Sequence, residues 1–288
     1  MDIDGKRIAL EFQEKLKLKI ANENLKPTLM FVLVGEDPPS QSYVRMKAKA
    51  CGEVGIRSQK LELRAKISEA DLLEFIEKLN VDPAINGILV QMPLPKHINE
   101  QKILLSINPD KDVDGFHPIN VGKMITGDPN AIIPCTPLGV LKLLEACNIE
   151  TSGKHVVVLG RSNIVGRPLA NLLSQKRAQG NATVTLVHSH TKDLPSICKQ
   201  ADILIAAIGK PRFVTKDFIK PGAVVIDVGI NRVTTNQVYK IVGDVNYEDV
   251  APQASYITPV PGGVGPLTIA MLLENTYLLT KLQLKQIS

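Results

Sequence analysis

Two polar side chains near the N-terminal end of the chain have a spacing that could serve catalysis. Tyr43 and Lys47 fall in the segment YVRMK, and residues four apart share one face of a helix. The aromatic ring could stack on a planar ligand, and the amine could accept or donate a proton. A tyrosine and a lysine at this spacing are also typical of a solvated helix face, so the pair alone leaves both interpretations open.

Polar residues in two later segments could belong to the same site. Gln91 interrupts the apolar run ILVQM, and a buried amide needs partners that a ligand or a neighbouring side chain could supply. Asp112 and Asp114 lie in KDVDGFH, a turn-like segment that could direct a carboxylate into a cleft. The structural alternatives are hydrogen bonds at a strand end for Gln91 and Asx turns for the two aspartates.

A glycine-containing turn, GRSNIVG, runs from Gly160 to Gly166 between an apolar strand and a helix. The first glycine permits a tight turn, and the second lets the backbone approach a ligand closely. The free N–H groups at the start of the helix attract phosphate. Ser162 stands where a dinucleotide-binding motif usually has its middle glycine. The turn alone could simply connect the strand to the helix, but the flanking strand–helix–strand pattern favours a nucleotide site.

The segment after the next expected strand favours NADP over NAD. It reads VHSHTK, from Val187 to Lys192, and has no acidic residue before Asp193. NAD-binding folds usually carry an acid here that bonds the 2′-hydroxyl of the ribose. The guanidinium of Arg161 and the hydroxyl groups of this segment would instead bind a 2′-phosphate, which a carboxylate would repel.

These residues need elements to position them, and the hydrophobic pattern predicts two α/β series with mostly parallel sheets. The first series has expected helices at 8–21, 41–54 and 68–79 and expected strands at 28–35, 58–64 and 87–92. Ser68 and Asp71 resemble a capping box at the start of the third helix. Residues 109–120 are rich in turn formers and break the pattern.

The second series begins after the segment PCTP. It has expected helices at 138–147, 165–174 and 194–199 and expected strands at 154–159, 183–188, 203–208 and 223–228. A last helix is expected at 267–282, with Pro266 at its first position. The pattern therefore predicts one domain over residues 1–137, completed by residues 267–288, and a second domain over residues 138–266.

Composition sets the class of protein. The 288 residues are 44% hydrophobic and 22% charged, which is typical of a globular chain, and the net charge of +5 comes without the basic runs of nucleic-acid binders. The four cysteines form no C-x-x-C pair, so we expect reduced thiols and no zinc site. The start of the chain lacks a signal-peptide pattern, and no apolar stretch reaches membrane-spanning length. We expect a soluble, cytoplasmic protein without a metal.

The motifs together resemble the bifunctional methylenetetrahydrofolate dehydrogenase/cyclohydrolase family. The resemblance covers nearly the whole chain and rests on blocks in the family's order: VGEDPPSQSYVRMKAKAC, GILVQMPLP, KDVDGFHPINVGK, PCTPLGV, GRSNIVGRP, DVGIN and PVPGGVGP. Because all seven blocks occur in the family's order, we prefer the functional interpretations of these residues to the structural alternatives above. The resemblance implies an N-terminal catalytic, folate-binding domain, a Rossmann-like NADP-binding domain, and usually a homodimer.

The resemblance also implies roles for individual residues. Lys47 matches the catalytic lysine, Gln91 the glutamine beside it, Tyr43 the tyrosine that stacks on the substrate, and Asp114 the aspartate that holds the pterin. The implied cofactor contacts are Gly160, Arg161, Ser162, Ser189 and Ile230, and the implied glycine loop near cofactor and substrate is Gly262 and Gly263.

The implied reaction has two steps in one-carbon metabolism and purine biosynthesis. NADP oxidises 5,10-methylenetetrahydrofolate to the methenyl compound, and water then opens that compound to 10-formyltetrahydrofolate. We expect Gln91 to hold Lys47 in place and Lys47 to govern the hydrolysis. The alternatives are a family member with dehydrogenase activity only, another two-domain NAD(P)-dependent dehydrogenase such as one acting on shikimate, and a nucleotide-sensing module. The last should lack the polar residues Lys47, Gln91 and Asp114.

Overall fold

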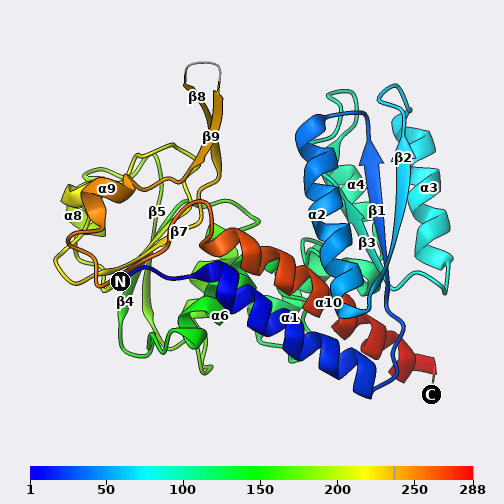
Figure 1. The fold of residues 1–288 in the computed structure, drawn as a ribbon, viewed down its shortest axis with the longest axis horizontal. Coiled ribbons are helices and arrows are strands. Elements are labelled where there is room, and N and C mark those ends of the chain that lie inside the picture. The colour runs from blue at the N-terminus through cyan, green and yellow to red at the C-terminus, as the bar shows by residue number, and fades with distance from the viewer. Residues whose placement is uncertain (236–237, 288) are drawn as a thin grey trace. The chain divides into compact units, whose positions relative to one another are not determined.

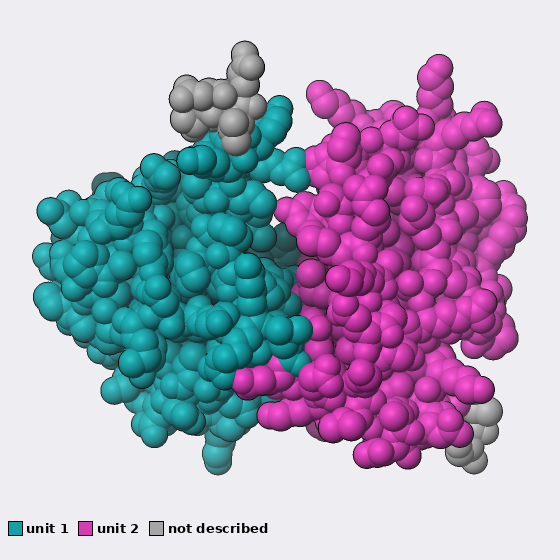
Figure 2. Space-filling view, in the orientation of Figure 1, with its two compact units in different colours: residues 1–10, 136–268 teal, residues 11–135, 269–288 magenta. Residues whose placement is uncertain are grey.

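The computed structural model describes residues 1–235 and 238–287 (Figure 1). Ser288, the end of the expected C-terminal segment, lies outside the described residues. The chain forms two compact units, which Figure 2 shows in different colours. Unit 1 consists of Met1–Leu10 and Thr136–Thr268, and unit 2 consists of Glu11–Cys135 and Ile269–Ser288. Each unit contains its own parallel sheet, which confirms the α/β class, while the boundaries of the functional domains stay a prediction.

Unit 2 is built on a three-stranded parallel sheet of order β2-β1-β3. The central strand β1 (Thr28–Val34) is buried at every position, as a continuous apolar run predicts. β2 (Arg57–Leu63) and β3 (Gly87–Val90) flank it. The helices α2 (Pro38–Val54) and α3 (Glu69–Val81) connect the strands and lie beside them in Figure 1. The apolar side chains of β1 and β3 form a core with those of α3.

The ends of α2 and α3 follow from their capping residues. At the start of α2, the carboxylate of Asp37 accepts the backbone N–H of Ser40 over 2.9 Å. The helix ends at Gly55, whose φ of 87° lies in the left-handed region that glycine adopts without strain. At the start of α3, the Ser68 hydroxyl accepts the N–H of Asp71 over 3.1 Å, which confirms the expected cap. Capping thus fixes the register of the helix that carries Tyr43 and Lys47.

Two helices of unit 2 and a strand end differ from the sequence-based expectation. The chain forms α4 (Glu100–Ser106), where we expected no particular element. It also forms a 3-10 turn at Pro109–Lys111 and α5 (Pro118–Thr126), whereas we expected turns over residues 109–120. Pro109 and Pro118 each open a helical turn, a position where the missing N–H of proline has no partner to lose. The third strand ends at Val90 and not at Met92, because Pro93 follows and has no N–H for a ladder bond.

Unit 1 contains a five-stranded parallel sheet of order β10-β7-β6-β4-β5. Its strands are β4 (His155–Leu159), β5 (Thr183–Val187), β6 (Ile203–Ala206), β7 (Val224–Asp227) and β10 (Tyr256–Ile257). The first four confirm the predicted strands, and the two-residue β10 was not predicted. Alternate residues of β4 face opposite sides of the sheet, and Val157 and Leu159 share a core with Cys198.

The remaining elements of unit 1 connect and extend this sheet. Its helices are α6 (Cys135–Ala146, of which Cys135 is assigned to unit 2), α7 (Gly166–Ser174), α8 (Leu194–Cys198) and α9 (Tyr247–Val250), with a 3-10 turn at Lys216–Phe218. The antiparallel strands β8 (Asn231–Thr235) and β9 (Val238–Val242) form a hairpin that the sequence did not predict.

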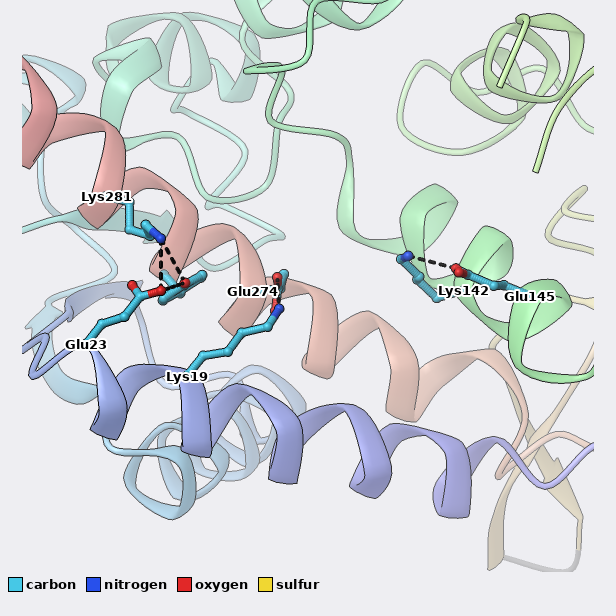
Figure 3. A network of polar contacts seen from close by, with 7 residues as sticks. Lys19, Glu23, Lys142, Glu145, Glu274 and Lys281 are labelled. Carbon is cyan, nitrogen blue, oxygen red and sulfur yellow. Dashed lines mark hydrogen bonds and ion pairs between the residues drawn. The ribbon is translucent and has the colours of Figure 1, made fainter. Parts of the chain in front are cut away.

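Helices α1 (Gly5–Asn22) and α10 (Val264–Ile287) contribute most of their residues to unit 2. There they lie side by side (Figures 1 and 3), joined by polar contacts. Lys19 Nζ lies 3.4 Å from Glu274 Oε1, and Glu23 accepts hydrogen bonds from the Tyr277 hydroxyl and the Lys281 ammonium. Among the described residues, no helix combines the length and the apolar character needed to span a membrane.

Candidate functional site

Lys47 and Gln91 meet at the carboxyl end of the sheet of unit 2. Lys47 lies on α2 and Gln91 directly follows β3, and Lys47 Nζ donates to Gln91 Oε1 over 3.1 Å. The amide of Gln91 is itself held, because its Nε2 donates to Met92 O over 2.7 Å and its backbone N–H donates to Val32 O over 2.9 Å. The amide oxygen is therefore the atom that faces the ammonium group. Tyr43, one turn before Lys47 on α2, is half-buried like Lys47.

Asp112 and Asp114 have different surroundings, although both lie in the same turn. Asp112 is 3% exposed and accepts the backbone N–H groups of Gly115 and His117 and the side-chain amide of Asn120. The Asp112 carboxylate thus binds backbone N–H groups three and five residues further along and holds this segment in place. The carboxylate of Asp114 has no such backbone bond among the described residues, so the turn leaves it available to a ligand.

The charge state of Asp114 depends on its burial. Burial raises the pKa of its carboxyl to about 6, the Lys47 ammonium lowers that pKa, and Asp112 raises it. Lys47 thus lies close enough to Asp114 for the two charges to interact. The structure thereby brings Lys47, Gln91 and Asp114 together in one unit.

Cys135 and Asn275 support this group, and sequence reasoning missed both. Asn275 on α10 is fully buried, and its Nδ2 donates to the carbonyl oxygens of Val113 and Ile133 over 2.9 Å each. The Cys135 thiol donates to Val113 O over 3.4 Å and lies 4.0 Å from Asp114 Oδ1. Burial raises the pKa of this thiol, so it stays protonated. Asn275 interrupts the apolar run of α10, the same signal that indicated Gln91.

The glycine turn of unit 1 is tightly packed and ordered by hydrogen bonds. Gly160 has a φ of 127°, and a Cβ there would collide with the carbonyl oxygen of Ala207. A Cβ at Gly166 would collide with the carbonyl oxygen of Gly160. Ser162, at the position of the missing middle glycine, accepts the N–H groups of Val165 and Gly166 through its hydroxyl, at 3.2 and 3.4 Å. Ser162 therefore orders the start of α7.

Cationic and hydroxyl groups lie next to this turn, at the ends of β4 and β5. Arg161 and Ser189 are exposed, and His188 is half-buried. Burial lowers the pKa of His188, and the charge of Arg161 lowers it further, so the two side chains are neighbours. The rings of His188 and His190 meet edge to face with centroids 6.2 Å apart. This arrangement suits a phosphate group.

The remaining candidate residues of unit 1 follow its strands β7 and β10. Ile230 lies between β7 and β8, and its side chain is 54% exposed. Gly262 has a φ of 110°, and a Cβ at Gly263 would meet Pro259 O at 2.6 Å, so both positions require glycine. The candidate cofactor contacts and this glycine loop therefore all belong to unit 1, and the candidate catalytic residues belong to unit 2.

Within the described ranges, no group of three or more His, Cys, Asp or Glu residues is placed to hold a metal ion. The four cysteines are free thiols.

Taken together, the fold and the two groups of residues define an α/β enzyme with a Rossmann-like, NAD(P)-binding unit. Two family models match the chain: the catalytic domain of tetrahydrofolate dehydrogenase/cyclohydrolase over residues 3–114, and the NAD(P)-binding domain of the same family over residues 134–284. The chain belongs to the tetrahydrofolate dehydrogenase/cyclohydrolase family.

Individual relatives agree over almost their whole length. The bifunctional protein FolD of Chlorobium phaeobacteroides is 55% identical, over 95% of this chain and 96% of that protein. The crystal structure of a bifunctional methylenetetrahydrofolate dehydrogenase/cyclohydrolase from Campylobacter jejuni has a TM-score of 0.92 at 49% identity and covers 98% of this chain and 99% of that one. The Trypanosoma brucei enzyme, complexed with NADP and an inhibitor, has a TM-score of 0.92 at 40% identity and covers 99% of this chain and 98% of that one.

Proposed function

We propose that this chain catalyses the NADP-dependent oxidation of 5,10-methylenetetrahydrofolate to 5,10-methenyltetrahydrofolate and the hydrolysis of that product to 10-formyltetrahydrofolate. Family membership over both units supports the pair of activities. The observation that carries the chemistry is the hydrogen bond from Lys47 Nζ to Gln91 Oε1 next to the carboxyl of Asp114. Neither a nucleotide-sensing module nor a shikimate dehydrogenase accounts for the family match.

NADP binding falls to unit 1. The glycines at 160 and 166 allow the tight turn before α7, because a Cβ at 160 would collide with Ala207 O and a Cβ at 166 with Gly160 O. Arg161, Ser162 and Ser189 provide the donors for phosphate groups, and Ile230 provides an apolar surface. When bound, NADP supplies the acceptor for the hydride of the methylene carbon. The main task of the protein in this step is to hold the two reacting carbons in position.

The residues proposed for hydrolysis belong to unit 2, and the family resemblance also implies a substrate contact for Gly262 and Gly263 of unit 1. Tyr43 stacks on the planar folate, and the Asp114 carboxylate accepts hydrogen bonds from the pterin. Hydrolysis adds water to the methenyl carbon and breaks one of its bonds to nitrogen. Lys47 Nζ moves the protons that this exchange requires, and Gln91 Oε1 fixes the direction of the amine.

A spectrophotometric assay tests the function. The protein is mixed with methylenetetrahydrofolate and either NADP or NAD, and reduced cofactor and methenyl absorbance are followed separately. We expect reduced cofactor to form with NADP while the methenyl compound does not accumulate. Methenyl accumulation would leave the dehydrogenase alone, and no turnover with either cofactor would contradict the proposal.

The cellular setting and the assembly form part of the same proposal. We propose a cytoplasmic protein, which its four free thiols support. We also propose a homodimer that supplies one-carbon units for purine biosynthesis, as the family resemblance implies. Light scattering after gel filtration tests the assembly: a dimer has twice the chain mass of 31.4 kDa. A particle of the chain mass itself would contradict it.

A further inference from the structure

Two buried carboxylates lie at the carboxyl end of the sheet of unit 1, outside the residues assigned so far. Asp227 is the last residue of β7 and is 3% exposed, and Asp244, after β9, is fully buried. A buried carboxylate is costly unless hydrogen bonds satisfy it. The partners of these two carboxylates therefore indicate what they hold.

Asp227 binds backbone on both sides of a turn. Its Oδ1 accepts the N–H groups of Gly229 and Asp244, and its Oδ2 accepts the N–H of Val245, each over 2.9 Å. A Cβ at Gly243 would collide with this carboxylate, so the backbone there packs directly on it. Asp227 thus joins the segment after β7 to the segment after β9.

Asp244 binds the two loops on either side of this junction. Its Oδ2 accepts the N–H groups of Ile208 and Gly209, over 2.7 and 2.9 Å, in the loop after β6. Its Oδ1 accepts the side-chain amide of Asn231 over 2.8 Å. A Cβ at Gly229 would collide with the Asp244 carboxyl. The donors come from segments that are distant in the sequence, and this side chain joins them.

The two carboxylates bind the residues on either side of one exposed apolar residue, Ile230. Ile230 lies between Gly229, whose N–H binds Asp227, and Asn231, whose amide binds Asp244. Its own side chain is 54% exposed, so packing does not hold it. Open α/β sheets bind their ligands at the carboxyl ends of the strands, where these loops lie. The hydrogen bonds therefore fix the backbone on both sides of Ile230 at this end of the sheet.

We propose that Asp244, together with Asp227, is a positioning residue for the cofactor: it holds Ile230 and the Ile208–Gly209 loop in the conformation that binds NADP. The inference rests on the proposed function, because Ile230 is a proposed cofactor contact. Asp244 acts through these loops and does not itself touch the reacting atoms.

The two proposed activities provide a readout that a merely structural residue would not change selectively. Hydrolysis of added methenyltetrahydrofolate consumes no NADP and uses Lys47 and Gln91 of unit 2. Loss of Asp244 should therefore lower dehydrogenase activity and NADP binding and leave the hydrolysis intact.

The experiment compares the wild type with Asp244→Ala, Asn231→Ala and the control Asp202→Ala. Asn231→Ala removes only the bond to Asp244 Oδ1. Asp202 accepts the N–H of His155 and pairs with Lys220 at the amino end of the same sheet, so its loss weakens the unit away from Ile230. The measurements are kcat/KM for NADP, the rate of hydrolysis of methenyltetrahydrofolate without NADP, and the melting temperature with and without NADP.

We expect Asp244→Ala to lower kcat/KM for NADP by about tenfold or more, since small displacements of binding groups have effects of this size. Asn231→Ala should have a smaller effect in the same direction. Both variants should keep the hydrolysis rate and lose part of the rise in melting temperature that NADP produces. Asp202→Ala should melt at a lower temperature without a selective loss of either activity.

Two outcomes would overturn the inference: kcat/KM for NADP that stays at the wild-type level in folded Asp244→Ala, or a parallel fall of both activities. If Asp244→Ala does not fold, Asn231→Ala decides on the same criteria. A wild type without either activity would contradict the proposed function, and the shift in melting temperature with NADP would still test the positioning role.

Discussion

The Lys47 ammonium donates to the amide oxygen of Gln91 over 3.1 Å, although the two residues come from different elements and lie 44 positions apart. Gln91 is fixed by its own bonds to Met92 and Val32, so the contact orients the lysine and not the reverse. A proton-transferring amine needs such an orientation to act at one carbon of its substrate. Through Gln91, which directly follows β3, the sheet therefore sets the direction of the lysine proposed to act in hydrolysis.

Replacing Gln91 should slow hydrolysis more than it affects folding. In Gln91→Ala the backbone bond to Val32 remains, but Lys47 loses its acceptor, and we expect hydrolysis of methenyltetrahydrofolate to fall by about ten- to a hundredfold. Gln91→Glu should also be slow, because a carboxylate at this position would hold Lys47 in an ion pair instead of a hydrogen bond with an amide. Steady-state rates and melting temperatures of both variants check this. A wild-type rate in folded Gln91→Ala would remove the positioning role.

Asp114→Asn should stabilise the fold while it impairs substrate binding. Burial raises the pKa of this carboxyl from 3.8 to about 6, so the folded state binds its proton more tightly than the unfolded state does. The contribution of Asp114 to stability is then complete below about pH 4 and is lost as the pH rises through about 6. At pH 7.5 the neutral amide should melt higher than the wild type, and near pH 4 the difference should vanish.

Melting curves at the two pH values measure this effect. Asp202→Asn is the control, because the Lys220 ammonium and the N–H of His155 lower the pKa of this carboxyl below its usual value. That variant should melt lower at pH 7.5. An Asp114→Asn protein that melts below the wild type at pH 7.5 would contradict the assigned burial of this charge.

The preference for NADP should depend on Arg161. In Arg161→Ala we expect KM for NADP to rise by about ten- to a hundredfold, the range for a hydrogen bond to a charged group, with little change for NAD. Arg167→Ala is the control, since Arg167 lies in the same segment but donates to Asn163 Oδ1 over 2.9 Å. Equal changes for NADP and NAD in Arg161→Ala would show that the residue does not read the 2′-phosphate.

The strands, and those site residues that have a local signal in the sequence, could be predicted from the sequence alone. Continuous apolar runs predicted the buried strands β1 and β4. The glycines at 160 and 166 predicted a turn, and the structure shows that neither position has room for a Cβ. Gln91 was recognisable as a polar residue in an apolar run. Such signals are local, because burial on both faces and close backbone approach each restrict single positions.

Other parts of the molecule had no local signal. Asp244 binds Ile208 across 36 positions, and Asn275 binds Val113 across 162, so only the folded chain shows why these polar residues are buried. The prolines that open α5 and the 3-10 turn at 109–111 were interpreted as breakers, because proline ends some elements and starts others. The β8–β9 hairpin lies in an otherwise parallel α/β pattern, which gave no reason to expect it.

The most direct test of the account is to follow methenyl absorbance and reduced cofactor together in the wild type and in Lys47→Met. Lys49→Met, a change two residues along α2 at an exposed lysine that pairs with Glu53, is the control. We expect the wild type and Lys49→Met to form reduced NADP without methenyl build-up, and Lys47→Met to hydrolyse methenyltetrahydrofolate about a hundredfold or more slowly. A folded Lys47→Met protein with the full hydrolysis rate would contradict it.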